Sequence, residues 1–538
     1  MVVARLERAT MKRTSWPERF GANLGFGALL AVLFLTFLDN TVASAVLTNV
    51  QSQLHAGVTE LQWVVGSYAL TFASLMLLSG SLADSFGRKK VMLVGVGIFC
   101  AGSIIAAIAS STSELIAGRV IMGVGAAASE PGTLSMIRHL FPSGPRRARA
   151  LGAWAAVSGL ALAMGPVLGG ILVGLWSWRA VFWFNLIFGL VALLVAALTL
   201  PESVNATRRR ADAGGFVVGA LALGIATFAT IDGESAGYRS VGVVTLYVVS
   251  GLLIVLFSFI ERHTLEPMLN PNFFRSRAFS GSIVIAFTSY FSIFSIFFFV
   301  ALYLEVIASV SAFGLAVDFL PLLAGMVTAS IFSGRWVGRM GSRTPLTAGC
   351  LLAAVGVALT NAAISPAVNL NELGWTMGLA GIGFGIIIVP INATALASLP
   401  PSYSGVAAST INTSRELGAV TGVAILGSIV NAQLTVHLTQ RLVRIGIPPL
   451  YRNQIIAAVT NGALNSKAKA FSNQSSPAIK AIINKVVNAA YGAFGHGLDI
   501  ALSLASVMLV ISAVVAWTTG TREPELNVTT TEELWSSP

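Results

Sequence analysis

Long apolar stretches recur almost end to end through the 538 residues, and this repetition limits the possible folds more than any other feature. Each stretch is roughly 20 residues long, the length that a helix needs to cross a bilayer core about 30 Å thick. Only 10% of the residues are charged and the mean hydropathy is +0.80, whereas a soluble domain is about 25% charged. A water-soluble protein is therefore excluded, and we predict one all-α polytopic membrane protein.

The apolar stretches predict 14 transmembrane helices. The first stretch is too long for a cleavable signal peptide and contains Asp39 instead of ending in a small-residue cleavage site. We place the spans at 24–50, 61–83, 91–110, 115–137, 150–175, 179–200, 214–232, 240–260, 279–303, 312–333, 346–365, 374–397, 405–430 and 497–517.

The distribution of Lys and Arg predicts the orientation of these spans. Alternate connecting segments, counted from the N-terminus, hold 22 of the 33 basic residues, whereas the facing segments hold 9. Basic residues are enriched in cytoplasmic loops, so we expect a protein of the cytoplasmic membrane with both termini on the cytoplasmic side. The net charge of +11 then reflects loop topology and gives no reason to expect a nucleic-acid partner.

One facing segment, 431–496, departs from this pattern. It holds seven basic residues and no Asp or Glu, but long loops cross a membrane largely regardless of charge. Within it, the stretch from Pro477 to Phe494 has apolar residues at helical spacing. We expect a helix resting on the outer leaflet; a lid or a partner-binding site is the alternative.

Several classes of membrane protein leave marks that this sequence lacks. It has no G-x-x-x-x-G-K-[ST] motif for an ATP-driven pump. All seven lysines and five histidines lie outside the middle of the spans, which disfavours retinal attachment and transmembrane haem ligation. Cys100 and Cys350 lie in separate apolar stretches. We therefore expect a secondary transporter driven by an ion gradient, with no cofactor and no metal.

A short motif occurs twice. Between the second and third spans the chain reads Gly80-Ser-Leu-Ala-Asp84-Ser-Phe-Gly87-Arg88-Lys89-Lys90, and a related segment begins at Gly334, 254 residues later. The glycines permit close helix approach and a tight turn, and Asp84 can accept hydrogen bonds from the N-terminus of a neighbouring helix. Two copies at matching positions indicate an internal repeat.

With this motif the chain resembles the major facilitator superfamily, in its fourteen-helix drug:proton antiporter branch. Three further motifs support the resemblance. They are Leu38, Asp39, Thr41 and Val42 in the first span; Arg119, Gly123 and Gly125 in the fourth; and Gly165, Pro166, Gly169 and Gly170 in the fifth.

The sequence departs from the family patterns at several positions. Gly338 replaces the Asp84 of the first copy, and Met122 replaces the glutamine that usually follows the fourth-helix arginine. Ser44 and Leu47-Thr48 replace the usual end of the first-helix motif, and Ala161 replaces a glycine of the fifth.

The resemblance implies two six-helix bundles with two helices inserted between them. We assign residues 1–202 to the first bundle, 203–262 to the inserted helices 7 and 8, 263–517 to the second bundle and 518–538 to a cytoplasmic tail. Substrate would bind near the midplane, and the bundles would rock to give alternating access.

Charged residues within spans are the candidates for coupling, because they are costly in a bilayer. Asp39 is the first candidate: burial favours a neutral carboxyl group and a bound cation favours a charged one, so proton and cation can compete there. A carboxylate that merely holds the helix is the alternative. The other candidates are Arg119, Glu130, Asp318 and Glu416.

Arg119 and Glu130 are 11 residues apart, which places them on one face of a helix about 16 Å apart along its axis. Glu130 stands before Pro131, where the resemblance implies an apolar residue, so we expect it to serve the substrate or proton path of this protein; a structural role is the alternative. Asp318 precedes Pro321 by three residues and is the candidate in the second bundle.

Two helices carry further candidate features. The fifth span has a stripe of small residues, namely Gly159, Ala163, Pro166 and Gly170, which permits close helix contact. The ninth is rich in aromatic residues, including Phe287, Tyr290, Phe291 and Phe294. These rings either contact lipid or line a cavity that holds flat or cationic drugs.

The sequence therefore predicts a monomeric drug:proton antiporter that expels amphipathic or cationic compounds. A dedicated exporter of one metabolite, lipid or antibiotic is an alternative within transport. A multi-spanning membrane enzyme is disfavoured because no recognisable catalytic constellation is present. A non-transporting receptor or scaffold would tolerate neutral replacements of the buried charges.

Overall fold

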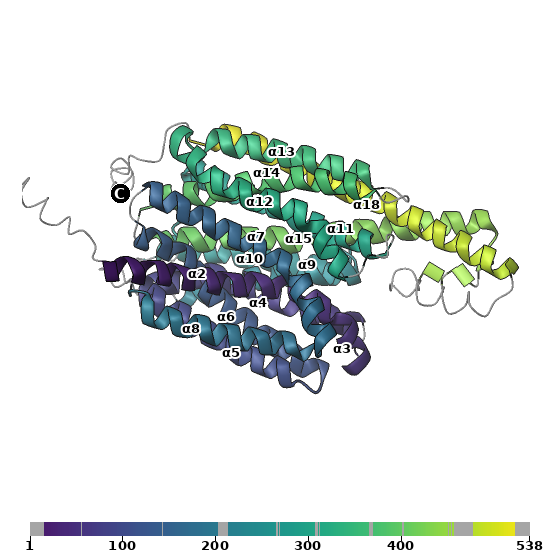
Figure 1. The fold of residues 1–538 in the computed structure, drawn as a ribbon, viewed down its shortest axis with the longest axis horizontal. Coiled ribbons are helices and arrows are strands. Elements are labelled where there is room, and N and C mark those ends of the chain that lie inside the picture. Colours follow the sequence, from purple (N-terminus) through teal and green to yellow (C-terminus); the bar gives the residue numbers. More distant parts are fainter. Residues whose placement is uncertain are drawn as a thin grey trace, which may run out of the picture.

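The computed structural model describes residues 16–521, except 55, 57, 142–143, 203–212, 265–266, 268, 307–309, 311, 365–368, 401–402, 450, 453–454 and 457–476. In this part of the chain the secondary structure is helical, and no strand is present. The long helices run side by side along one direction (Figure 1).

Fourteen long helices account for nearly all of the described chain. Twelve of them are long and apolar enough to cross a membrane; α4 and α7, each bent by more than 40°, bring the number to 14 if each bent pair is one span. The predicted all-α polytopic fold is therefore confirmed. The long helices are α2 (Trp16–Val42), α4 (Val58–Phe86), α5 (Arg88–Ile108), α6 (Thr112–Leu140), α7 (Gly144–Leu175), α8 (Arg179–Thr199), α9 (Ala213–Ala236), α10 (Val241–His263), α11 (Arg277–Val306), α12 (Ala312–Met340), α13 (Arg343–Ala363), α14 (Leu370–Ala397), α15 (Ser404–Ile445) and α18 (Pro477–Thr519).

Three short helices lie in the connections: η1 (Ala43–Val46), α3 (Leu47–Leu54) and η2 (Pro271–Arg275). Polar side chains at the ends of helices mark where the spans begin. Ser111 accepts a hydrogen bond from the Glu114 backbone N–H at 3.3 Å, and Asn369 does the same for Glu372. Such caps satisfy backbone donors that have no partner within the helix.

The helices pair in the same order in two sets of six. In the first set, α2 packs on α7 and α8, α6 on α4 and α5, and α5 on α8. In the second set, α11 packs on α15 and α18, α14 on α12 and α13, and α13 on α18. Every contact within the first set thus has a counterpart in the second set, between the helices that occupy the same positions in chain order. Such a correspondence is expected for an internal repeat.

Glycines occupy equivalent positions in the two sets. Gly87, between α4 and α5, has φ +106°, and Gly341, between α12 and α13, has φ +72°. Residues with a side chain rarely adopt such backbone angles. A Cβ on Gly95 would lie 2.7 Å from the Gly125 carbonyl oxygen, and one on Gly349 would lie 3.1 Å from that of Gly383. The third and fourth helices of each set are therefore held close by matching glycines.

The two sets meet along two helix pairs, α4 with α15 and α7 with α12. Each pair joins the second helix of one set to the fifth helix of the other. Helix α9 lies against α4 and α15, and α10 packs mainly on α9. Most side chains of α10 are exposed, as expected for a helix that faces lipid.

The segment 431–496 differs from the predicted outer loop. Helix α15 continues to Ile445 and α18 begins at Pro477, so these helices are 42 and 43 residues long. Together they project beyond the other helices as an arm (Figure 1). Leu434, Leu438 and Ala493 are buried between them. The expected helix from Pro477 to Phe494 is thus continuous with the last span and projects from the bundle instead of lying across its end.

Candidate functional site

Asp39 forms a buried ion pair inside the first set of helices. Its side chain is fully buried in α2, and Oδ2 accepts a hydrogen bond from Nη1 of Arg119 in α6, also fully buried. The other carboxylate oxygen, Oδ1, accepts a hydrogen bond from Asn185 Nδ2 of α8 at 2.7 Å. The two predicted coupling residues are therefore direct partners.

Helix α4 fixes the guanidinium group of Arg119. Arg119 Nε donates to the Val64 carbonyl oxygen at 3.0 Å, and its Cζ lies 4.4 Å from the centre of the Tyr68 ring. The Tyr68 hydroxyl in turn donates to the Thr36 carbonyl oxygen at 3.1 Å. Four helices, α2, α4, α6 and α8, thus converge on one charge pair.

The sequence analysis did not single out Asn185 or Tyr68. Asn185 is a polar amide within the otherwise apolar stretch 180–198, and that isolation was the available signal. Removing either partner of a buried ion pair leaves an uncompensated charge, at a cost of about 3–5 kcal/mol. Neutralising Asp39 with a proton has the same effect on Arg119.

A second charged cluster lies where the two sets of helices meet. It consists of Glu130 from α6 and Arg415 and Glu416 from α15, whose exposed fractions are 1%, 2% and 2%. The charges of Arg415 and Glu416 both act on Glu130. The structure therefore brings Glu130 and Glu416, two of the predicted coupling residues, into one electrostatic neighbourhood.

Aromatic rings from both sets surround Arg415. Its Cζ lies 4.2 Å from the ring centre of Tyr290, 5.1 Å from that of Trp154 and 5.4 Å from that of Phe37. Its Nη2 donates to the Tyr290 hydroxyl, and Nη1 donates to Asn412 Oδ1 at 2.9 Å. The hydrogen bonds of Arg415 thus go to neutral groups, and its buried Nε receives no partner from the described residues.

The two glutamates of this cluster differ in their partners. Glu416 Oε2 accepts a long hydrogen bond, 3.4 Å, from Asn40 Nδ2 of α2. Neither carboxylate oxygen of Glu130 receives a hydrogen bond from the described residues, although both oxygens are buried. A buried carboxylate without a partner is costly, so Glu130 needs a proton, a water molecule or a ligand.

Asp318 lies apart from both clusters. It is partly exposed on α12, and among the described residues no hydrogen bond or ion pair to it is found. The adjacent Phe319 stacks on Phe297 of α11 with 5.4 Å between ring centres. The structure thus gives Asp318 no contact with the other candidate residues.

The loop motif joins the two sets at one end of the molecule. Asp84 Oδ1 accepts hydrogen bonds from Arg88 Nε at 3.0 Å and Nη2 at 2.8 Å, while Oδ2 accepts one from the Val406 backbone N–H at 3.2 Å. Val406 lies in the first turn of α15, where free N–H groups and the helix dipole favour an anion. A Cβ on Gly80 would lie 2.5 Å from the Gly405 carbonyl oxygen.

Lys89 serves the neighbouring helix end. Its Nζ donates to the carbonyl oxygens of Ala197 and Leu200, each at 2.7 Å, at the C-terminus of α8. A cation there offsets carbonyl groups that lack partners within the helix. Asp84 therefore caps the N-terminus of α15, and Lys89 caps the C-terminus of α8.

The small residues of α7 face two different helices. Gly159 lies against Met326 of α12, and a Cβ on Gly165 would lie 2.8 Å from the Cβ of Thr41 in α2. Thr41 Oγ1 also donates to the Leu162 carbonyl oxygen at 2.9 Å. The side chains of Ala163 and Pro166 lie outside the described set; Gly169 is buried and Gly170 partly exposed.

The aromatic residues of α11 do not share one environment. Tyr290 faces Arg415 at the centre, and Phe291 is buried against Gly422 of α15. Phe287 and Phe294 are partly buried, whereas Phe298 is 47% exposed. Phe298 thus lies on the surface of the bundle, whereas Tyr290 and Phe291 lie inside it; a drug-binding role for these rings stays a prediction.

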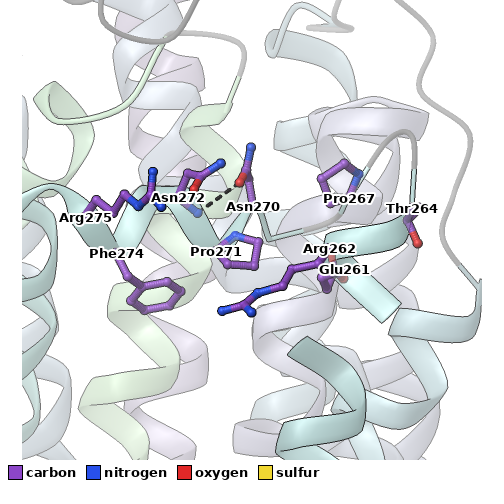
Figure 2. Close-up of a pocket in the computed structure, with 9 residues that line it drawn as sticks. All are labelled: Glu261, Arg262, Thr264, Pro267, Asn270, Pro271, Asn272, Phe274 and Arg275. Atoms are coloured by element: carbon purple, nitrogen blue, oxygen red, sulfur yellow. Dashed lines mark hydrogen bonds between the residues drawn. The ribbon is translucent and has the colours of Figure 1, made fainter. Parts of the chain in front are cut away.

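A hollow of about 780 Å³ lies away from these groups, where α10 leads through η2 into α11. Figure 2 shows its lining, in which Asn272 N–H donates to Asn270 Oδ1 at 2.9 Å. None of the predicted site residues lines it. Within the described ranges, no group of three or more His, Cys, Asp or Glu side chains is placed to hold a metal ion.

Comparison with known proteins gives consistent results. The sequence profile of the Major Facilitator Superfamily matches residues 29–423. The multidrug resistance protein Stp of Mycobacterium tuberculosis (strain ATCC 25618 / H37Rv) is 30% identical over 81% of each chain. The puromycin resistance protein pur8 of Streptomyces alboniger is 30% identical over 92% of this chain and 90% of its own. The methylenomycin A resistance protein of Bacillus subtilis (strain 168) is 31% identical over 79% of this chain and 92% of its own.

Solved structures agree at the level of the fold. The proton:xylose symporter XylE superposes with a TM-score of 0.62 over 96% of this chain and all of its own, at 13% sequence identity. The human organic anion transporter MFSD10 gives a TM-score of 0.58 over 93% of this chain and 99% of its own, at 15% identity.

Proposed function

Because the chain belongs to the major facilitator superfamily, whose profile covers residues 29–423, we propose that it is a proton-coupled exporter of amphipathic or cationic small molecules. As a member of this family the protein is a transporter and not an enzyme. Export of drugs is supported by the names of its relatives, which include a multidrug resistance protein and resistance proteins for puromycin and methylenomycin A.

The Asp39–Arg119 pair carries the proposal of proton coupling. While Asp39 is ionised, it neutralises Arg119 and, with Asn185, ties α2, α6 and α8 together. A proton on Asp39 leaves the Arg119 charge without a counter-ion in a fully buried place, which is unfavourable by several kcal/mol. Protonation therefore loosens the first set of helices, and release of the proton restores it.

Alternating access is supported by the division into two sets of helices. The two sets contact each other mainly along α4 with α15 and α7 with α12. They can therefore rock about the cluster of Glu130, Arg415 and Glu416, called the central cluster below. We place the protein in the cytoplasmic membrane with both termini on the cytoplasmic side, in accordance with the distribution of basic residues, and we propose that it acts as a monomer. The proposed domains are 1–202, 203–262, 263–517 and 518–538.

The experiment is a proton-release assay in inverted vesicles. The vesicles hold a pH dye and an imposed proton gradient, and candidate substrates are added one at a time. Substrates should dissipate the gradient in wild-type vesicles and fail to do so with Asp39→Asn, while Asp499→Asn, a change of an exposed residue, should behave as wild type. Dissipation by no compound, or wild-type behaviour of Asp39→Asn, would contradict the coupling.

A dedicated exporter of one compound is the second candidate, because two of the relatives are named after resistance to a single antibiotic. The same vesicles distinguish the two. A multidrug exporter responds to structurally unrelated compounds, whereas a dedicated exporter responds to one chemical series. A non-transporting receptor or scaffold would respond to none.

A further inference from the structure

Glu130 is the one carboxylate of the central cluster for which the described residues supply no hydrogen bond. Both of its oxygens are buried, and the side chain is 1% exposed. It stands on α6, in the first set of helices, and faces the charged residues of α15, in the second. A ligand bound to it would therefore be enclosed by both sets and released when they separate.

The charges at the centre of the molecule do not balance. Asp39 and Arg119 neutralise each other as a direct pair. Glu130 and Glu416 together face a single cation, Arg415, which makes its hydrogen bonds to the neutral groups of Asn412 and Tyr290. With both glutamates ionised, the cluster is short of one positive charge, and such a deficit is costly in a buried place.

We propose that Glu130 binds the single positive charge of a monocationic substrate, and that a proton occupies the same carboxylate when the substrate is absent. This inference rests on the proposed export function and adds the class of substrate and the group that recognises it. The reaction at Glu130 is a simple exchange: the carboxylic acid loses its proton as the organic cation pairs with the carboxylate, so the net charge of the cluster does not change.

The surroundings of Glu130 suit an aromatic or alkyl-substituted cation. Trp154 of α7 and Tyr290 of α11 present their faces at the centre, where they now contact Arg415. Aromatic faces attract desolvated cations. When Arg415 moves with the second set of helices, an organic cation can contact these ring faces in its place. A small ion that keeps its hydration shell cannot make this contact.

Few other ionisable groups compete for this role. Arg415 and Glu416 face Glu130 from α15, and Tyr290 and Tyr68 lie near it on α11 and α4. Helix α7 contributes the neutral side chain of Trp154, and α2 contributes the neutral Asn40 together with Asp39, which is paired with Arg119. A change in proton occupancy therefore reports on Glu130, on Glu416 or on Asp39, and substitution of each carboxylate distinguishes them.

The test uses two probes of similar size and different charge. Tetraphenylphosphonium is a permanent monocation, and triphenylphosphine oxide is neutral. Binding to the purified full-length protein is measured by equilibrium dialysis, and proton release is measured with a pH dye in weak buffer. Wild-type protein should bind the cation more tightly than the neutral probe and release about one proton per cation bound.

Three variants separate the possible outcomes. Glu130→Gln, nearly isosteric, should weaken binding of the cation about 10-fold to 100-fold, the value of a charge-assisted contact, abolish proton release and leave binding of the neutral probe unchanged. Glu130→Asp should recover part of both signals. Glu416→Gln should keep proton release if Glu130 is the exchanging group.

Two results would overturn the assignment: equal binding of the two probes by wild-type protein, or cation binding and proton release by Glu130→Gln at the wild-type level. Failure of the general coupling proposal looks different. In that case Asp39→Asn would still support transport driven by the gradient in vesicles, whatever the result for Glu130. Size-exclusion profiles and melting temperatures in detergent establish that each variant is folded.

Discussion

The carboxylate of Asp84 lies 3.2 Å from the backbone nitrogen of Val406, a residue 322 positions later in the chain. This contact ties the end of α4 to the first turn of α15 and so links the two sets of helices. Asp84→Asn removes the charge and weakens both this contact and the pair with Arg88. We expect a slower transport rate and a loss of stability of about 0.5–2 kcal/mol, as for the loss of a helix cap, measured by vesicle transport and thermal unfolding. Gly338→Asn, at the equivalent place in the second repeat, should leave the transport rate unchanged.

Close contact of α5 with α6 predicts that Gly95→Ala is poorly tolerated. The added Cβ would lie 2.7 Å from the Gly125 carbonyl oxygen, and backbone atoms cannot yield without separating the helices. We expect a loss of about 1–3 kcal/mol, typical of overpacking, seen as a lower melting temperature in detergent. Gly97→Ala on the same helix meets no atom within 4 Å, and a similar loss in that variant would contradict the explanation.

The ion pair of Asp39 and Arg119 predicts non-additive effects on stability. Asp39→Asn leaves the buried Arg119 charge unpaired and should cost about 3–5 kcal/mol. The double variant Asp39→Asn, Arg119→Gln removes both charges and should be more stable than the single variant, although it should not couple transport to protons. Thermal unfolding of wild type, Asp39→Asn, Arg119→Gln and the double variant tests this. Strictly additive losses of stability would show that the two residues do not interact.

The different environments of the α11 aromatic residues predict different effects on substrate selection. Tyr290→Phe removes the hydroxyl that accepts a hydrogen bond from Arg415 and should change the relative transport of cationic and neutral compounds. Phe298→Ala alters a side chain that is 47% exposed and should leave that ratio as in wild type. Resistance profiles of cells that express each variant measure the ratio, and equal profiles would show that the Tyr290 hydroxyl takes no part in substrate selection.

The seam between α15 and α18 predicts that the arm is stabilised by apolar contact. Leu438 is fully buried there, whereas Val436 is 51% exposed. Leu438→Ala should cost about 2–5 kcal/mol and raise hydrogen–deuterium exchange in 434–445 and 485–496. The same exchange in Val436→Ala as in Leu438→Ala would show that burial is not what holds the arm together.

The number and order of the helices followed from the sequence because each span requires a long apolar stretch, and the positions of those stretches match the long helices. Family membership likewise followed from short motifs such as Gly80 to Lys89. Both depend on local sequence. The arm was misjudged because 431–496 mixes polar and basic residues, and hydropathy marks the limits of the membrane, not those of a helix that continues beyond it.

The partners of the buried charges could not be predicted in the same way. Asp39 and Arg119 were both singled out, but their pairing depends on how α2 packs on α6, and Asn185 comes from a third helix. Glu130 and Arg119 share a helix, yet Arg119 pairs within the first set and Glu130 faces the second. Asp318 has the same chemistry as Asp39 and lies at a partly exposed position, which only the tertiary structure distinguishes.

The two long helices make the arm a rigid extension of the second set. Residues 431–445 of α15 alone form about 22 Å of helix, in the part of the molecule that projects as the arm (Figure 1). On such a lever, each 10° of tilt of the second set displaces the tip by about 4 Å relative to its base. A spin label at exposed Arg444 would therefore magnify the rocking motion, so that distances measured outside the membrane report on a rearrangement at its centre.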